Sequence, residues 1–195
     1  MRENRGVVSG ALVLTIFGAL WALPAVSYFP APLVWIALGV AVLVTLVLLG
    51  LCAWRWRTSP LTAGFEQDGA GSHTRLSRFG SVVSIEGLAI LVASIALSRS
   101  EHITYIAPVV SVIVGLHFFP LAALFSMRAY YLTAVLFVFP STGAIVAQLL
   151  GVTLGAPENW HILIGIFDAL VLWLTAAAVL AAGTPVNAAR PMPDG

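Results

Sequence analysis

The chain has 195 residues, 60% of them hydrophobic and only 9% charged, with a net charge of +1, a single cysteine and a mean hydropathy of +1.01. Soluble domains have about 45–50% apolar and about 25% charged residues, so this composition indicates an integral membrane protein and gives no sign of a nucleic-acid partner, an intramolecular disulfide or a thiolate metal cluster. Because six spans of about 20 residues leave only about 75 residues for every loop and tail, a separate soluble catalytic module is excluded.

Six apolar runs follow one another along the chain, and each is long enough to cross a bilayer as a helix. They are Val7 to Tyr28, Pro32 to Trp54, Gly80 to Ser98, Ile106 to Phe125, Tyr131 to Leu154 and His161 to Ala182. Spanning strands would alternate over about 10 residues instead. The sequence therefore predicts an all-α polytopic membrane protein, with one domain of six transmembrane helices over residues 1–195.

The first run follows two arginines and has some features of a signal peptide. Its apolar stretch of about 20 residues is longer than the apolar region of a signal peptide, which has about 7–15 residues, and Pro24 lies inside the would-be cleavage site. We therefore expect this run to be retained as the first span.

The placement of the arginines predicts the orientation of the spans. If the N-terminus is cytoplasmic, the outer segments hold only Arg99. The cytoplasmic segments then hold Arg2, Arg5, Arg55, Arg57, Arg75, Arg78, Arg128 and Arg190. Cytoplasmic loops of membrane proteins carry the excess of basic residues, so we expect both termini to be cytoplasmic (N-in/C-in).

One connector is long, residues 55–79, and it is rich in Gly, Ser and Thr without apolar periodicity. We expect a flexible cytoplasmic loop whose arginines fix the topology and contact anionic headgroups. A docking site for a cytoplasmic partner or a phosphoryl group is the alternative. Residues 183–195 are expected to form a flexible C-terminal tail.

A weak internal repeat relates the two halves of the chain. Val7 to Ser9 resembles Val109 to Ser111, and Ile85 to Leu88 resembles Phe167 to Leu170. Three spans followed by three more of opposite direction is the arrangement of inverted-repeat transporters. The matches favour a 3+3 inverted repeat, and chance similarity of short apolar strings is the alternative.

Three ionisable residues lie well inside the predicted spans: Glu86, His117 and Asp168. Insertion scales assign about 2.5–3.5 kcal/mol to an acidic side chain at a span centre, so each is expected to face the bundle interior or a wet cavity. With a rise of about 1.5 Å per residue, all three lie within about 5 Å of their span centres. They predict a midplane substrate or proton pathway, and a hydrogen-bonded network that only holds helices together is the alternative.

Three hydroxyl residues belong to the same candidate pathway. Ser141 and Thr142 follow Pro140 in the fifth span at a similar depth. Thr15 of the first span aligns with His117 if the repeat holds.

The fourth span contains a distinctive string in which a proline follows the histidine by three residues. Because Pro120 has no N–H, we expect a helix kink that frees the carbonyl of Leu116 beside His117; a kink that serves packing alone is the alternative. The string is Gly115-Leu116-His117-Phe118-Phe119-Pro120-Leu121-Ala122. Over about one span it is similar to uncharacterised bacterial multi-pass integral membrane proteins, a resemblance that implies no activity. We expect the inner (plasma) membrane of a bacterium as the location.

Two features lie at the predicted outer ends of the spans. Glu101 and His102 precede the fourth span, and Glu158 and His161 open the sixth. We interpret them as solvated helix ends and predict no metal site and no cofactor.

Gly151 and Gly155 form a GxxxG pattern that favours close helix packing, with a homodimer through these glycines as the second use.

The sequence lacks the motifs of several enzyme classes, namely HExxH, the P-loop and Gly-x-Ser-x-Gly, so no enzymatic activity is expected. The working prediction is a small transporter or channel that moves a proton, an ion or a small polar solute through the midplane site. Two alternatives remain. One is a non-transporting scaffold or partner-binding subunit, and the other is an intramembrane enzyme that acts on lipid.

Overall fold

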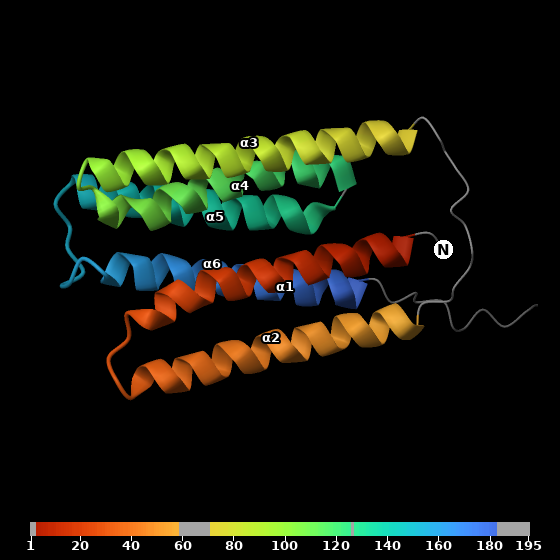
Figure 1. Ribbon diagram of the computed structural model, residues 1–195, viewed down its shortest axis with the longest axis horizontal. Helices are drawn as coiled ribbons and strands as arrows, with labels where there is room; N and C mark the ends of the chain where they lie inside the picture. The colour runs from red at the N-terminus through yellow and green to blue at the C-terminus, as the bar shows by residue number, and fades with distance from the viewer. Residues whose placement is uncertain (1–2, 59–70, 126, 183–195) are drawn as a thin grey trace, which may run out of the picture.

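The computed structural model describes residues 3–58, 71–125 and 127–182, and all regular secondary structure in these ranges is helical (Figure 1). The elements are α1 (Glu3–Ser27), α2 (Leu33–Thr58), α3 (Gly71–Arg99), the 3₁₀ helix η1 (Ile103–Tyr105), α4 (Ile106–Phe125), α5 (Arg128–Leu149) and α6 (Asn159–Ala182). The prediction of an all-α protein is therefore confirmed.

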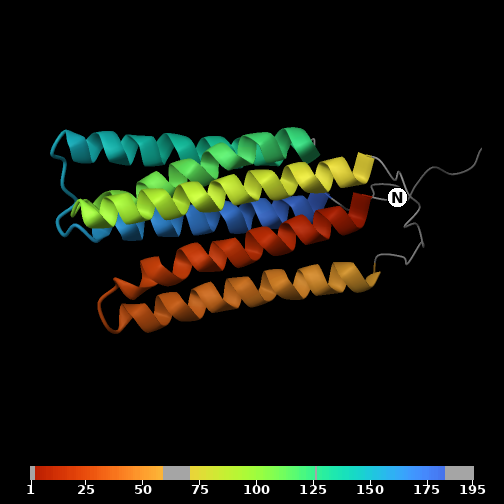
Figure 2. The same ribbon diagram turned by 45° about the horizontal axis from the view of Figure 1, so that its top comes forward.

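The six long helices are each long and apolar enough to cross a membrane. Their apolar segments are Val7–Ser27, Leu33–Thr58, Val82–Arg99, Ile103–Leu124, Arg128–Leu149 and Asn159–Ala182. The helices run side by side along the long axis of the molecule (Figures 1 and 2). The chain is a multi-pass membrane protein, as its composition predicted. We call the end of the bundle where α1 begins and α6 ends the proximal end, and the opposite end the distal end.

The helices at the proximal end extend beyond the apolar runs. α2 continues through Arg55 and Arg57 to Thr58, and α3 already begins at Gly71. The connector is therefore shorter than the predicted loop over residues 55–79. Arginines in the last turn of a helix interact favourably with the helix dipole. A helix can therefore continue into a polar segment that lies beyond the apolar run of its span. Residues 59–70 and the predicted tail, 183–195, lie outside the described residues.

The fifth helix ends earlier than its apolar run. α5 stops at Leu149, and Gly151 and Gly155 follow it in the connection to α6 with φ values of 77° and 85°. Such positive φ values are readily adopted by glycine and belong to turns. The prediction that these two glycines form a helix-packing GxxxG motif is therefore wrong, and the homodimer it suggested loses its structural basis.

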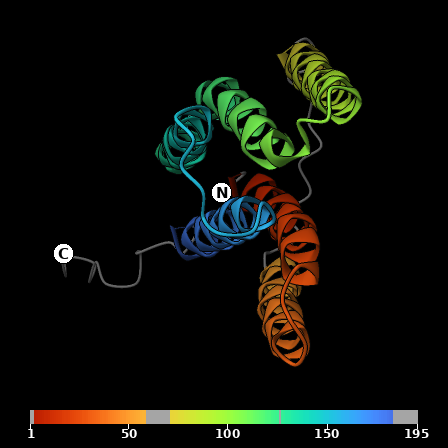
Figure 3. The same ribbon diagram turned by 90° about the vertical axis from the view of Figure 1, so that its left-hand side faces the viewer.

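The core of the bundle is built by α1, α4, α5 and α6. The most extensive helix contact joins α1 to α6, the next joins α4 to α5, and α6 also packs on α5 and α4. Seen along the bundle axis, α2 and α3 lie at opposite edges of this group (Figure 3). α2 packs mainly on α1, and α3 packs mainly on α4.

Close approach of α1 and α6 depends on a glycine. A Cβ atom at Gly18 would lie 2.5 Å from Nε1 of Trp173, and the same indole N–H donates a hydrogen bond of 3.3 Å to the carbonyl oxygen of Thr15. Trp173 is thereby held in the space that Gly18 leaves open. In the hydrocarbon region, where packing rather than water exclusion drives helix association, such small residues set how closely two helices approach.

The peripheral helix α3 has an unusual environment, because no residue of its apolar segment Val82–Arg99 belongs to the fully buried core. Large apolar side chains such as Ile85, Leu88 and Val92 are 57–69% exposed. A helix that exposes large apolar side chains in a membrane protein faces lipid or another membrane protein. Its attachment to the bundle therefore depends on the single face that meets α4.

Reporter fusions test the expected orientation. The ends of α2 and α6 and the start of α3 lie at the proximal end (Figure 1), where the arginine excess is found. Fusions at Gly69 and Gly195 should therefore report a cytoplasmic location, and a fusion at Ser100 an external one. A fusion at Gly195 that reads external while Gly69 reads cytoplasmic would contradict the six-span topology.

Replacement of Gly18 by alanine tests the α1–α6 contact. The added methyl group collides with the Trp173 indole, and overpacking of this kind costs about 1–3 kcal/mol, so the melting temperature in detergent should fall by several degrees. Gly87→Ala is the matched control, because nothing lies within 4 Å of a Cβ at this position. That variant should be neutral or slightly more stable, since alanine is the better helix former. Equal effects of the two changes would refute the packing argument.

Candidate functional site

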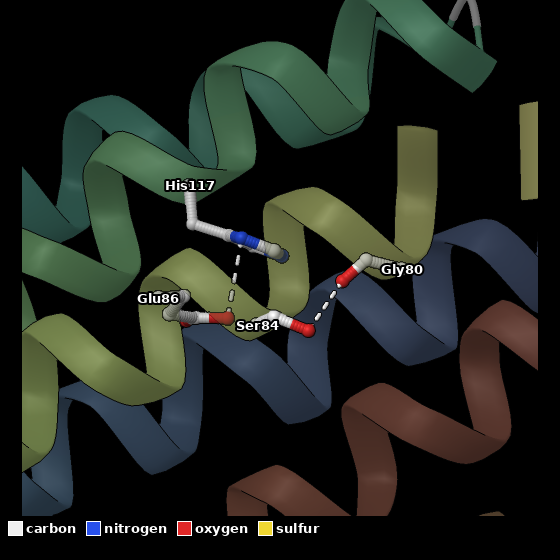
Figure 4. Close-up of polar contacts among 4 residues, drawn as sticks. All are labelled: Gly80, Ser84, Glu86 and His117. Carbon is white, nitrogen blue, oxygen red and sulfur yellow. Dashed lines mark hydrogen bonds and ion pairs between the residues drawn. The ribbon is translucent and has the colours of Figure 1, made fainter. Parts of the chain in front are cut away.

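The structure brings Glu86 and His117 together between α3 and α4. Their side chains point toward one another (Figure 4), and Oε2 of Glu86 lies 3.2 Å from Nδ1 of His117. This separation is that of an ion pair, although Nδ1 makes no hydrogen bond. Both side chains are largely buried, with 12% and 9% of their surfaces exposed. The pair is electrically neutral when it holds one titratable proton beyond the N–H of neutral imidazole, whether that proton is on the imidazole or on the carboxyl.

Pro120 lies inside α4 one turn beyond His117, toward the proximal end. The helix is continuous from Ile106 to Phe125, so the expected kink does not interrupt it. The carbonyl of Leu116 has no N–H donor at position 120, as the sequence predicted. Leu116 is 54% exposed, so this residue lies on the outer side of α4, whereas His117 faces α3.

Asp168 occupies a second and different site in the core of the bundle. It lies on α6, its side chain is completely buried, and neither of its carboxyl oxygens has a partner at hydrogen-bond geometry. Ser111 of α4 is the hydroxyl that lies near this carboxyl and can donate to it. Buried polar groups in proteins are nearly always hydrogen-bonded, so an unsatisfied carboxyl inside a membrane protein requires an explanation.

Two hydroxyl groups, one from α5 and one from α4, lead to this carboxyl of α6. The Ser141 hydroxyl of α5 donates a hydrogen bond of 2.7 Å to the oxygen of Ser111. The proton of Ser111 is consequently free to point toward Asp168. Both serines are buried, with 1% or less of their surfaces exposed. We call Asp168, Ser111 and Ser141 the Asp168 cluster.

The Asp168 cluster and the Glu86–His117 pair are separate sites. Ser111 and His117 are six residues apart on α4, which corresponds to about 9 Å along the helix axis and about 120° around it. The cluster lies toward the distal end and the pair lies closer to the proximal end. The three ionisable residues therefore share the middle of the membrane, but they do not form one site.

The remaining residues of the predicted pathway fall into different environments. Thr15 is fully buried on α1, where its hydroxyl donates to the carbonyl of Ala11 and its own carbonyl accepts from Trp173. It belongs to the α1–α6 packing contact. Thr142 is on the exposed face of α5, so the structure does not bring it to the cluster that contains its neighbour Ser141.

Three polar residues that sequence reasoning missed also lie in the core. Ser111 completes the Asp168 cluster, and the hydroxyls of Thr133 and Thr175 form a buried hydrogen bond of 2.8 Å between α5 and α6. For Thr175, the helical spacing from Asp168 indicates this position. Thr175 lies seven residues after Asp168, and this interval returns to the same helix face.

A half-open apolar pocket of about 240 Å³ lies between α5 and α6. Its walls include Pro140 and Ala144 of α5 and Trp160 and Phe167 of α6, but not the carboxyl of Asp168. The lining offers almost no polar surface. The pocket is therefore unsuited to a polar solute.

The acidic and histidine residues at the distal end are not gathered into a cluster. The ring of His161 stacks on Tyr28 with centroids 5.6 Å apart, and Nδ1 of His102 lies 2.6 Å from the carbonyl oxygen of Ser100. Within the described ranges, no three His, Cys, Asp or Glu side chains come together in a way that could hold a metal ion.

Comparisons with protein-family models, with curated proteins and with solved structures return no match. The class of the protein is therefore defined by its fold, as a six-helix multi-pass membrane protein, and its function is argued from the two polar sites.

A double-mutant cycle measures the coupling between Glu86 and His117. Glu86→Ala and His117→Ala should each lower the free energy of unfolding, and the double variant should lose less than the sum, because each single change leaves a buried partner unpaired. Coupling in membrane proteins averages about 0.6 kcal/mol and reaches about 1.7 kcal/mol. Ser84→Ala is the control, because the Ser84 hydroxyl donates to the carbonyl of Gly80 on its own helix (Figure 4). Strictly additive losses would show that the pair is not coupled.

Proposed function

We propose that the protein moves a proton or a small monovalent cation across the membrane, through the core formed by α4, α5 and α6. The observation that carries this proposal is Asp168, a fully buried carboxyl whose oxygens make no hydrogen bond of standard geometry and which has the Ser111 hydroxyl as a nearby donor. Ionisable residues within membrane spans mark ion pathways and proton relays.

A purely structural role does not account for the geometry of Asp168. A side chain that serves to join helices gains its stability from interhelical hydrogen bonds, and a buried polar group without them is destabilising. A proton or a small cation on the carboxyl would relieve this cost. Ser111 and Ser141 supply oxygen atoms next to it, which are the ligands that a proton or a hard cation needs.

The size of the site favours a small cargo. The cluster is enclosed by helices on several sides, and the pocket of about 240 Å³ between α5 and α6 is apolar. Neither offers a compartment lined with polar groups for a sugar, an amino acid or another polar solute. Of the cargoes that the sequence left open, a proton or a small cation therefore fits best.

The Glu86–His117 pair provides a second exchange site in this proposal. The two groups lie 3.2 Å apart, so a small adjustment of either side chain would allow a proton to pass between them. The pair lies about 9 Å from Ser111 along α4, toward the proximal end. Because it faces α3 on another side of α4, it lies beside the path through α4, α5 and α6 and is not a step of that path.

A second function, binding to a partner membrane protein, is favoured by one observation. The apolar segment of α3 has no buried residue, and α3 packs mainly on α4, so most of its surface is available to another helix. This scaffold function does not need the buried carboxyl of Asp168. We propose no enzymatic activity, because the Ser141 hydroxyl contacts Ser111 rather than a histidine that could act as a base.

We further propose that the protein resides in the inner membrane of a bacterium with both termini in the cytoplasm. The arginine distribution supports the orientation. In this orientation the Asp168 cluster lies in the outer half of the membrane and the Glu86–His117 pair nearer to the cytoplasm.

Asp168→Asn tests the proposal in proteoliposomes. The amide keeps the size of the side chain but cannot ionise or exchange a proton at accessible pH, so flux driven by a pH gradient or by a sodium or potassium gradient should fall to the level of empty vesicles. The melting temperature in detergent should stay within a few degrees of the wild type. Internal pH and cation indicators measure the flux.

Thr142→Val is the matched control, because Thr142 lies on the exposed face of α5 at nearly the same depth as the cluster. Its flux should equal that of the wild type. Wild-type vesicles that conduct neither protons nor these cations above empty liposomes would overturn the proposal, and so would full flux in the Asp168→Asn variant. The partner-binding function would then be the remaining interpretation.

A further inference from the structure

The buried face of α5 carries a stripe of polar side chains along most of the membrane. From the proximal to the distal end, the residues on this face are Tyr130, Thr133, Ala134, Phe137, Ser141, Ala144 and Gln148. Apart from Ala134, they follow one another at intervals of three or four residues, which keeps them on one side of the helix. Four of the seven are polar, although the span as a whole is strongly apolar. We call this set the α5 stripe.

The neighbouring helices place further polar groups opposite both halves of the stripe. In the distal half, Ser111 and Asp168 face Ser141, and the side-chain nitrogen of Gln148 is buried without a partner. In the proximal half, Thr175 faces Thr133. The stripe and its partners therefore form two polar segments that follow one another along the same helix interface.

Phe137 is the bulky apolar residue that separates the two segments. It is completely buried, and its ring lies 6.2 Å from the ring of Trp21 and 5.9 Å from that of Phe118. Its Cβ also fills the space left by Gly115, where a Cβ would lie only 2.7 Å away. Residues from α1 and α4 thus pack around this ring of α5 in the bundle interior.

We propose that the α5 stripe lines the path of the transported proton or cation and that Phe137 is the barrier that closes this path in the described conformation. The inference rests on the proposed function and names the route and the residue that blocks it. Apolar constrictions in membrane pores stop ions by excluding water. A transient displacement of the Phe137 ring would join the distal polar segment to the proximal one.

An apolar interval separates the polar groups of the distal segment from those of the proximal segment. Thr175 and Asp168 are seven residues apart on α6, or about 10.5 Å along the axis, which is too far for a direct hydrogen bond. Leu172 and Phe137 fill this interval, and at most 1% of either surface is exposed. A proton can cross only when water occupies part of this volume. Removal of the Phe137 ring should supply that space permanently.

Cysteine accessibility tests this route without knowledge of the cargo. Cys52 is the chain's only cysteine, so Cys52→Ala provides a cysteine-free background. Ser141→Cys and Thr133→Cys are then introduced singly and treated with a charged, membrane-impermeant methanethiosulfonate from the predicted outer side. Thr142→Cys and Leu132→Cys are their respective controls, because each lies next to the tested residue but on the exposed face of α5.

The expected result depends on the side of Phe137 on which the cysteine lies. Ser141 is buried in the described conformation, so Ser141→Cys should be labelled from the distal side when the distal polar segment is transiently hydrated. Thr133→Cys should react at least about tenfold more slowly, because the reagent must also pass an apolar constriction. Addition of Phe137→Ala should bring the rate at Thr133→Cys close to that at Ser141→Cys. Phe137→Leu, which keeps a large apolar side chain, should leave it slow. Both controls on the exposed face should stay unlabelled in every background.

Several outcomes would overturn the inference. Equal labelling of both cysteines with Phe137 present would show that this residue is no barrier, and unchanged labelling after Phe137→Ala in a folded variant would show that the stripe is not a path. If Ser141→Cys or Phe137→Ala fails to fold, Gln148→Cys and Phe137→Val make the same comparison. Cation or proton flux measured on the same vesicles separates this inference from the proposed function. An opened path without flux would refute the function alone, whereas flux that depends on Asp168 without a change in labelling would refute the route alone.

Discussion

The absence of water from the hydrocarbon core is the constraint on which this structure depends. Backbone groups there must bond within their own segment, so the apolar runs become helices. The same constraint applies to side chains, because a polar group inside the bilayer must find its partner in the protein. Thr15 and Thr133 meet this demand by bonding to carbonyls of the preceding turn. Asp168 does not fully meet this demand, because neither of its carboxyl oxygens has a partner at hydrogen-bond geometry. The proposed function depends on this exception.

α4 is the helix that connects the two polar sites. One of its faces presents Ser111 to the Asp168 cluster, and another presents His117 to Glu86 of α3. The same helix also contributes Gly115 and Phe118 to the aromatic group around Phe137. A shift or rotation of α4 would therefore alter both polar sites and the barrier between the polar segments. The fold places all three features on an element that packs against α3, α5 and α6.

The sequence was sufficient to predict the class of fold, the six spans and the ionisable residues that enter the core. These follow from hydropathy and from the rarity of charge inside a span. It was not sufficient to predict which of these residues meet. Glu86 and His117 form a pair, whereas Asp168 of α6 lies against another face of α4, because partner choice depends on the rotation of each helix about its axis. Ser111, Thr133 and Thr175 were missed for the same reason. Gly151 and Gly155 were misread because apolar residues continue past the end of α5, where positive φ angles turn the chain.

The exposure of α3 has a consequence for the membrane in which the protein works. This helix has the bilayer as its main packing partner, because its apolar segment contains no buried residue. Helices respond to a change in hydrocarbon thickness by tilting, and a helix attached along one face tilts more easily than one enclosed by neighbours. Any tilt of α3 moves Glu86 relative to His117, which is fixed on the more enclosed α4. The lipid chain length of the bilayer, which sets its hydrocarbon thickness, therefore alters the geometry of this ion pair through the tilt of α3.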